Sequence, residues 1–196
     1  MDNKRIKENA SASLISSPSA VGGMTIKGVF TCECYDAQGN LKWADKAHNH
    51  VATVGTNLML DTLMAGSGYT VTGPYMGLIS GNSTYSTTAV GDTMSSHAGW
   101  DEAGATYDPT YSGSRKTCVW SSASGGAISL STALSFTFTG SGSVEGCFIV
   151  TGSGALATID NTSGTLFSAG AFTGGTKTVA STDVLNVSYT VTITDT

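Results

Sequence analysis

The chain has 196 residues, of which 40% are hydrophobic, 12% are charged and 25 are glycine, and its net charge is −5 at pH 7. This length fits one domain, or one domain with a small appendage, and it buries enough surface to fold without metal or disulfide staples. The hydrophobic share excludes a disordered chain, and the negative charge argues against a surface that coats nucleic acid.

Residues 1–23 are small and polar, and they predict a flexible N-terminal arm before a single domain at 24–196. The first 22 residues carry a net charge of +1 and the rest carry −6, because three cations outweigh two acids there: Lys4, Arg5 and Lys7 against Asp2 and Glu8. We expect these cations to contact an acidic neighbouring subunit, with a solvated tail as the competing interpretation. No apolar stretch resembles a signal peptide or a membrane span, so we expect no membrane partner.

Residues 24–35 alternate between apolar and polar side chains, which is typical of a half-buried strand. The face predicted to lie inside carries Met24, Ile26, Phe30, Cys32 and Cys34. Residues 36–40 then predict a turn, and Leu41 begins the returning strand of a hairpin.

Apolar residues at positions 51, 54, 58, 59 and 63 follow the spacing of a helix. We predict one α-helix over residues 53–65, with Gly66 as its stop signal and a loop from 66 to 73.

The remaining apolar runs predict strands that are separated by turns rich in glycine and serine. They lie at 75–80, 118–120, 128–139, 144–151, 164–167 and 183–194. Many short antiparallel strands indicate a mainly β fold, and we predict a β-sandwich of jelly-roll type with the one short helix.

None of the four cysteines lies in a Cys-x-x-Cys pair. Cys32 and Cys34 share one face of a strand, which places them poorly for bonding to each other. We therefore interpret Cys32, Cys34, Cys118 and Cys147 as small buried hydrophobic residues in a reducing compartment.

Most residues able to do chemistry lie near the long stretch 81–116, but they form no complete catalytic or metal-binding pattern. His48 and His50 would need a third ligand to hold zinc, and only His97 remains. Ser95-Ser96-His97 lies near Asp92, Asp101 and Glu102, yet adjacent Ser and His residues do not normally take the nucleophile–base geometry. We expect no enzyme activity, cofactor or metal. We predict instead that Asp92, Asp101 and Glu102 order the loop through hydrogen bonds. We also predict that these acids form ion pairs with Arg115 or Lys116.

The same stretch contains residue types that anchor protein interfaces. We predict that it is a contact surface formed by Tyr85, Trp100, Tyr107, Tyr111 and Arg115. A sugar-binding platform built on Trp43, Trp100 and Trp120 is the alternative that we weigh against it.

The order of several short motifs resembles that of a group of tailed-bacteriophage virion proteins, over roughly residues 25–194. These motifs are Gly55-Thr56-Asn57-x-x-Leu60-Asp61, Tyr75-Met76-Gly77-Leu78, Asp92-Thr93, His97-Ala98-Gly99-Trp100-x-Glu102, Tyr107, Arg115, Gly146-Cys147-Phe148, Gly164-Thr165-Leu166 and Asp183-Val184-Leu185-Asn186-Val187. The arm 1–23 lies outside this pattern.

The resemblance implies a structural virion component without catalysis, assembled in the cytoplasm of a host bacterium. We expect a capsid decoration or cement protein that binds the major capsid protein or another virion subunit and forms a dimer or trimer. The alternative is an adaptor of the tail or fibre, or a module that binds a receptor or glycan.

Overall fold

The computed structural model describes residues 23–65, 72–81 and 88–195. Residues 1–22 of the predicted arm, which include Lys4, Arg5 and Lys7, lie outside these ranges. The predicted stop signal Gly66 and the candidate interface residue Tyr85 also lie outside them. In chain order, the elements are β1 (Met24–Tyr35), β2 (Leu41–Val51), α1 (Thr53–Leu63), β3 (Tyr75–Ser80), β4 (Lys116–Thr117), β5 (Ala127–Ser129), β6 (Leu134–Thr137), β7 (Gly142–Thr151), β8 (Thr165–Ala171), β9 (Lys177–Val179) and β10 (Val184–Asp195). The prediction of a mainly β fold with one short helix is confirmed.

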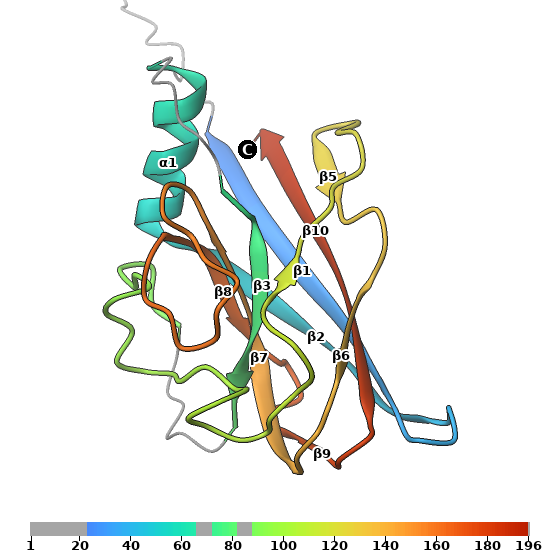
Figure 1. Ribbon diagram of the computed structural model, residues 1–196. Coiled ribbons are helices and arrows are strands. Elements are labelled where there is room, and N and C mark those ends of the chain that lie inside the picture. The colour runs from blue at the N-terminus through green and yellow to red at the C-terminus, as the bar shows by residue number, and fades with distance from the viewer. Residues whose placement is uncertain (1–22, 66–71, 82–87, 196) are drawn as a thin grey trace, which may run out of the picture.

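The strands form one antiparallel sheet that curls into a half-barrel (Figure 1). Its order is β4-β3-β7-β8-β2-β1-β10-β5, with β6 paired to β10 and β9 to β7. The predicted jelly-roll sandwich is not confirmed, because the hydrogen-bonded path runs through both walls of the sheet. The walls join where β2 meets β8, at the pairs His50↔Ala169 and Val51↔Ser168.

The alternating residues of β1 and β10 build the main core, as their period of two predicts. Phe30 pairs with Tyr189 across the two strands, and their rings stack with centroids 4.3 Å apart. Cys32 and Cys34 are also buried on this face, whereas Met24 is 70% exposed. The prediction for Met24 is wrong because the first residue of β1 lies beyond the packed core, which begins at Ile26.

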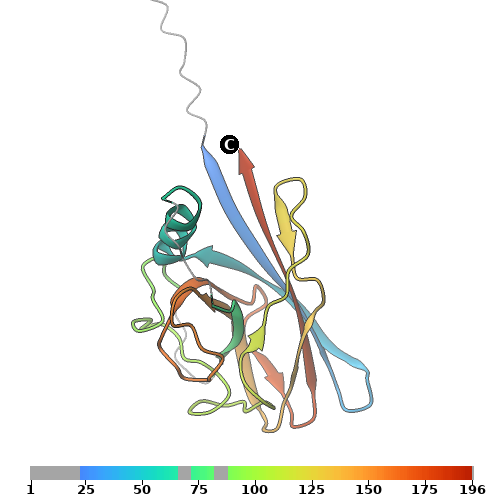
Figure 2. The same cartoon turned by 45° about the horizontal axis from the view of Figure 1, so that its top comes forward.

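Helix α1 ends at Leu63, two residues before its predicted end, and Met64 closes it with an N–H bond to the Leu60 carbonyl at 2.7 Å. Gly55 lets the helix approach β8 closely, because a Cβ at this position would lie 2.7 Å from the Phe167 carbonyl oxygen. The helix therefore packs beside the sheet at one end of the half-barrel, next to the start of β1 and the end of β10 (Figure 2).

Several strands differ in detail from the predictions. The predicted strand 128–139 is divided into β5 and β6, because residues 131–133 leave the sheet between them. The predicted strand at 118–120 is replaced by β4 just before it, and Trp120 makes a single bridge to Leu130. The short strand β9 was not predicted, because the stretch around it is polar and rich in glycine.

All four cysteines are free and buried, as the sequence predicts. Cys32 and Cys147 face each other from β1 and β7, with their sulfur atoms 3.9 Å apart. Burial raises the pKa of the Cys118 thiol to about 12. The pKa of the Cys34 thiol is raised to about 11, mainly by burial and to a smaller extent by the negative charge of Asp183. Both side chains therefore stay protonated at neutral pH.

Candidate functional site

A buried ion pair anchors the long connection between β3 and β4. Arg115 donates two parallel hydrogen bonds to Glu102, from Nε to Oε1 at 2.8 Å and from Nη2 to Oε2 at 2.6 Å. Burial raises the pKa of the Glu102 carboxyl, and the hydrogen bond and charge of Arg115 oppose that shift. The sequence prediction that one of the loop acids pairs with Arg115 is confirmed, and the structure selects Glu102.

The same ion pair holds a second loop, which connects β7 to β8. Arg115 also donates to the carbonyl oxygens of Leu156 at 3.0 Å and Asn161 at 2.7 Å, while the Asp160 N–H donates to Glu102 Oε2 at 2.8 Å. Every contact of the pair is therefore internal, and its arrangement is that of a structural clamp between two loops.

His97 and Trp100 form a second ordered unit in the connection. Their rings stack with centroids 3.9 Å apart, and His97 Nδ1 donates to the Trp100 carbonyl oxygen at 2.8 Å. The indole N–H of Trp100 donates to Asp92 Oδ2 at 3.2 Å. Asp92 and His97 thus help to order this loop through hydrogen bonds. For Asp92 this agrees with the prediction from the sequence.

These two units line a small polar cavity of about 200 Å³. Its walls come from the connection before β4 and from the loop before β8, with Tyr107, Asp160, Asn161 and Thr162 beside the residues named above. Aromatic faces with amide, carboxyl and hydroxyl groups around them suit a small polar ligand such as part of a sugar.

Three of the predicted interface residues are buried within the chain, so this part of the prediction is wrong. Trp100 packs on Phe148, Tyr111 meets the ring of Phe136 edge-on, and Arg115 lies in the clamp. A large side chain in a long loop turns inward when the loop folds back on the sheet, as the bridge between Ile79 and Glu102 shows for this one. Tyr107 is 39% exposed, and it is the one predicted interface residue within the described ranges that is not buried.

The tryptophans of the alternative sugar platform do not gather on one surface. Trp43 packs on Phe172, and its indole N–H donates to the Thr178 carbonyl oxygen at 3.1 Å. Trp120 packs edge-on against Tyr189 with centroids 6.0 Å apart, while Trp100 lies in a separate core cluster. A platform that uses all three rings is therefore excluded.

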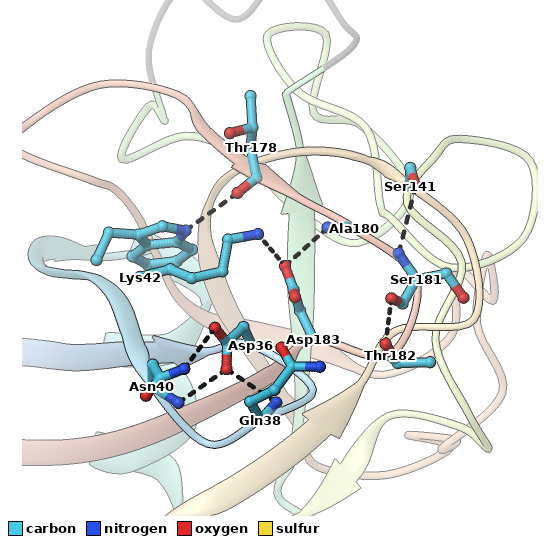
Figure 3. Close-up of polar contacts among 11 residues, drawn as sticks. Asp36, Gln38, Asn40, Lys42, Ser141, Thr178, Ala180, Ser181, Thr182 and Asp183 are labelled. Carbon is cyan, nitrogen blue, oxygen red and sulfur yellow. Dashed lines mark hydrogen bonds and ion pairs between the residues drawn. The ribbon is translucent and has the colours of Figure 1, made fainter.

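The turns at the end of the half-barrel opposite α1 (Figure 1) are held by their own polar contacts (Figure 3). Asp36 accepts hydrogen bonds from the backbone of Gln38 at 2.9 Å and Asn40 at 2.8 Å. Lys42 and the Ala180 N–H both donate to the carboxylate of Asp183. The bonds from Asn40 lower the pKa of Asp36, which therefore stays charged and acts as the structural centre of its turn.

Sequence reasoning missed an apolar groove of about 580 Å³ at the end that carries α1. One wall is α1, the other is the end of β10 with β5 and the segment before it, and β7 and β8 contribute to its lining. Its lining residues are Leu58, Met59, Thr62, Leu63, Pro74, Trp120, Ala123, Gly126, Ala127, Ile128, Ile149, Thr151, Phe167, Val191 and Ile193. Among these described residues none is charged.

Exposed apolar side chains flank this groove. Leu63 is 81% exposed and Met64 is 76% exposed at the end of α1, and Met24 starts β1 next to the end of β10. We call the groove together with Met24 and Met64 the apolar end. The signal in the sequence was the run Leu58-Met59-Leu60, followed by Leu63-Met64, which holds more apolar residues than one buried helix face requires.

Within residues 23–65, 72–81 and 88–195, no three His, Cys, Asp or Glu side chains gather into a group that could hold a metal ion. The only helix described over these ranges is too short to cross a membrane. Comparison with protein-family models, curated proteins and solved structures gave no match to this chain.

Proposed function

We propose that the protein is a non-enzymatic structural subunit of a tailed-phage virion, and that it decorates and stabilises the capsid. The observation that carries this proposal is the apolar end. Monomeric proteins seldom leave a large apolar surface in water, and such surfaces usually mark contacts with other proteins. The groove has no charged lining residue among those described, and the Leu63 and Met64 side chains stand exposed beside it.

The internal contacts elsewhere support the same choice of surface. The Glu102–Arg115 clamp and the Asp183 network satisfy their own charges within the chain. Burial of the apolar end against another subunit would remove hydrophobic area from water, which is the main source of affinity between proteins that associate stably. Within this proposal the curled sheet is a variant of a jelly-roll sandwich, with its two walls joined at β2 and β8.

The proposal is tested with particles of the phage that encodes the chain, prepared without the protein and then mixed with purified variants. Leu63→Asp places a charge on the apolar end at an exposed position, so the fold should be retained. We expect binding to weaken by about tenfold or more, because the charge would have to be buried without a partner. The matched control is Gln38→Asp in the β1–β2 turn, at the far end of the domain.

Equal binding of the two variants would contradict the assignment of the interface, and absence of the protein from purified particles would contradict the virion function. The copy number per particle separates the head from the tail, since a decoration protein covers the capsid lattice and a tail adaptor is present in few copies. Either variant must show the wild-type circular dichroism spectrum before its binding is interpreted.

A second candidate function, a glycan-binding module of the tail, draws on the polar cavity beside the clamp. Tyr107, Asp160 and Asn161 line it, and this combination of ring, carboxylate and amide suits a saccharide. Binding of host-surface glycans to the protein, lost in Tyr107→Ala, together with a low copy number in particles, would favour this function over capsid decoration.

A further inference from the structure

The apolar groove has the volume of a site that takes a ligand or several side chains. The described part of the chain leaves the space between its walls unfilled. Leu58 and Met59 line the wall formed by α1, and Val191 and Ile193 line the wall formed by β10. An occupant that replaces water there should be apolar and uncharged, because a buried charge would have no charged partner in the lining.

One segment of this chain matches these requirements. Residues 2–8 hold five charged side chains, whereas residues 9–23, with the sequence NASASLISSPSAVGG, hold none. The large apolar residues of this uncharged segment are Leu14, Ile15 and Val21. The charge pattern therefore divides the N-terminal region into an outer charged part and an inner part that suits an apolar groove.

The position at which this segment joins the domain places it beside the groove. Met24, the first residue of β1, pairs with Asp195 at the end of β10, and Ile26 pairs with Ile193, which lines the groove. Figure 2 shows the start of β1 and the end of β10 at the same end of the domain as α1. The chain therefore enters the described domain within two residue pairs of the groove wall.

The length of the connection is sufficient for the segment to turn back. The eight residues between Ile15 and Met24 span up to about 28 Å when extended, and α1 with its eleven residues is about 16 Å long. Gly22 and Gly23 precede β1, and glycine adopts both signs of φ that a reversal of chain direction uses. The short tether gives the segment an effective concentration on the order of millimolar at its own groove, which favours it over a second copy at low protein concentration.

We propose that residues 14–21 dock in the apolar groove of their own chain, with Leu14 and Ile15 against α1 and β10. The docked segment covers the lining of the groove and leaves Leu63, Met64 and Met24 exposed at its border. These exposed side chains, together with the docked segment, then form the surface that meets the other subunit in the proposed function. This inference goes beyond the proposed function, because no virion subunit takes part in it. If residues 14–21 dock, the flexible arm that the sequence predicts over 1–23 is shortened to the residues before position 14, which include the five charged side chains.

The test is disulfide cross-linking in the full-length chain with the pair Ser16→Cys and Thr62→Cys. Both replacements are close in size to the original side chains, Thr62 lines the groove, and the native cysteines are buried. The matched control pair is Ser16→Cys with Gln38→Cys, since Gln38 lies in the exposed β1–β2 turn at the far end (Figure 1). Mild oxidation of dilute protein should give a cross-link within one chain for the first pair, identified by mass spectrometry, and little for the control.

Adding Leu14→Asp and Ile15→Asp to the first pair should lower the yield by about tenfold or more, because two charges would enter an apolar site. Adding Ser19→Asp, which leaves the large apolar residues in place, should change it less. A product of double size would overturn the proposal in favour of a second copy. Equal yields from the two cysteine pairs, or a yield insensitive to the aspartates, would overturn it in favour of another occupant. No particles are involved, so this result is independent of the test of virion function.

Discussion

The Glu102–Arg115 clamp gives a sharp prediction about stability. Glu102→Gln keeps the size and shape of the side chain but removes the negative charge from a pair whose side chains are 6% and 0% exposed. Arg115 would then be a buried cation without a counter-ion. Removing one partner of a buried pair costs about 3–5 kcal/mol, and since about 1 kcal/mol corresponds to roughly 2–4 °C in a domain of this size, we expect Tm to fall by roughly 10 °C.

The pair as a whole should contribute much less than this loss suggests. Burial raises the pKa of the Glu102 carboxyl, and Arg115 opposes this shift. In buried ion pairs the cost of removing both charges from water generally offsets most of their attraction. Glu102→Gln and Arg115→Met made together should therefore cost less than the sum of the single losses, with a coupling energy of about 2 kcal/mol or more. In the double variant the carbonyl oxygens of Leu156 and Asn161 lose the hydrogen bonds that Arg115 donates to them. This loss sets the destabilisation that remains in the double variant.

Urea unfolding of the wild type, both single variants and the double variant measures this cycle, with slopes compared to confirm that the unfolding transition is unchanged. Asp108→Asn is the matched control, because it removes an exposed carboxylate from the same connection. It should change the unfolding free energy by less than about 0.5 kcal/mol. A loss below about 1 kcal/mol for Glu102→Gln, or additive single effects, would refute the clamp as a coupled buried pair.

Three further predictions concern the core. Leu185→Asp places an unpaired charge at a fully buried site of β10 and should cost more than about 4 kcal/mol, so circular dichroism at 25 °C should show an unfolded chain, and a native spectrum would contradict the core assignment. Gly55→Ala should lower Tm, because its Cβ would lie 2.7 Å from the Phe167 carbonyl oxygen, whereas Ala at the open turn position Gly91 should have little effect; equal Tm values would count against the close helix–strand packing. The Cys118 thiol has its pKa raised to about 12, so it stays protonated in the fold while the unfolded thiol ionises above about pH 8.5, and stability is lost as pH rises through this window. Compared with Cys118→Ala, the wild type should lose about 2 kcal/mol more unfolding free energy between pH 7 and pH 10, and equal losses in urea titrations would refute the shift.

The sequence by itself predicted features that depend on neighbouring residues along the chain. The alternation in 24–35 and 183–194 identified β1 and β10 and the inward side of most of their residues, because side chains in a strand alternate between two faces whatever the rest of the fold does. The spacing at 54, 58 and 63 likewise identified α1 to within two residues of its end. The prediction that a loop acid pairs with Arg115 also succeeded, since opposite charges in one connection lie within reach of each other.

Only the tertiary structure decided which surfaces face outward and what lies between elements far apart in the chain. Trp100 and Tyr111 have the same chemistry whether they anchor an interface or a core, and the loop that folds back on β3 buries them. The apolar groove arises because β2 carries α1 to the end of the half-barrel where β10 finishes, which brings residues near 60 and near 192 to opposite walls of one hollow. Sequence patterns report the local periodicity of side chains, whereas burial depends on which distant segments cover them, and that is set by the path of the sheet.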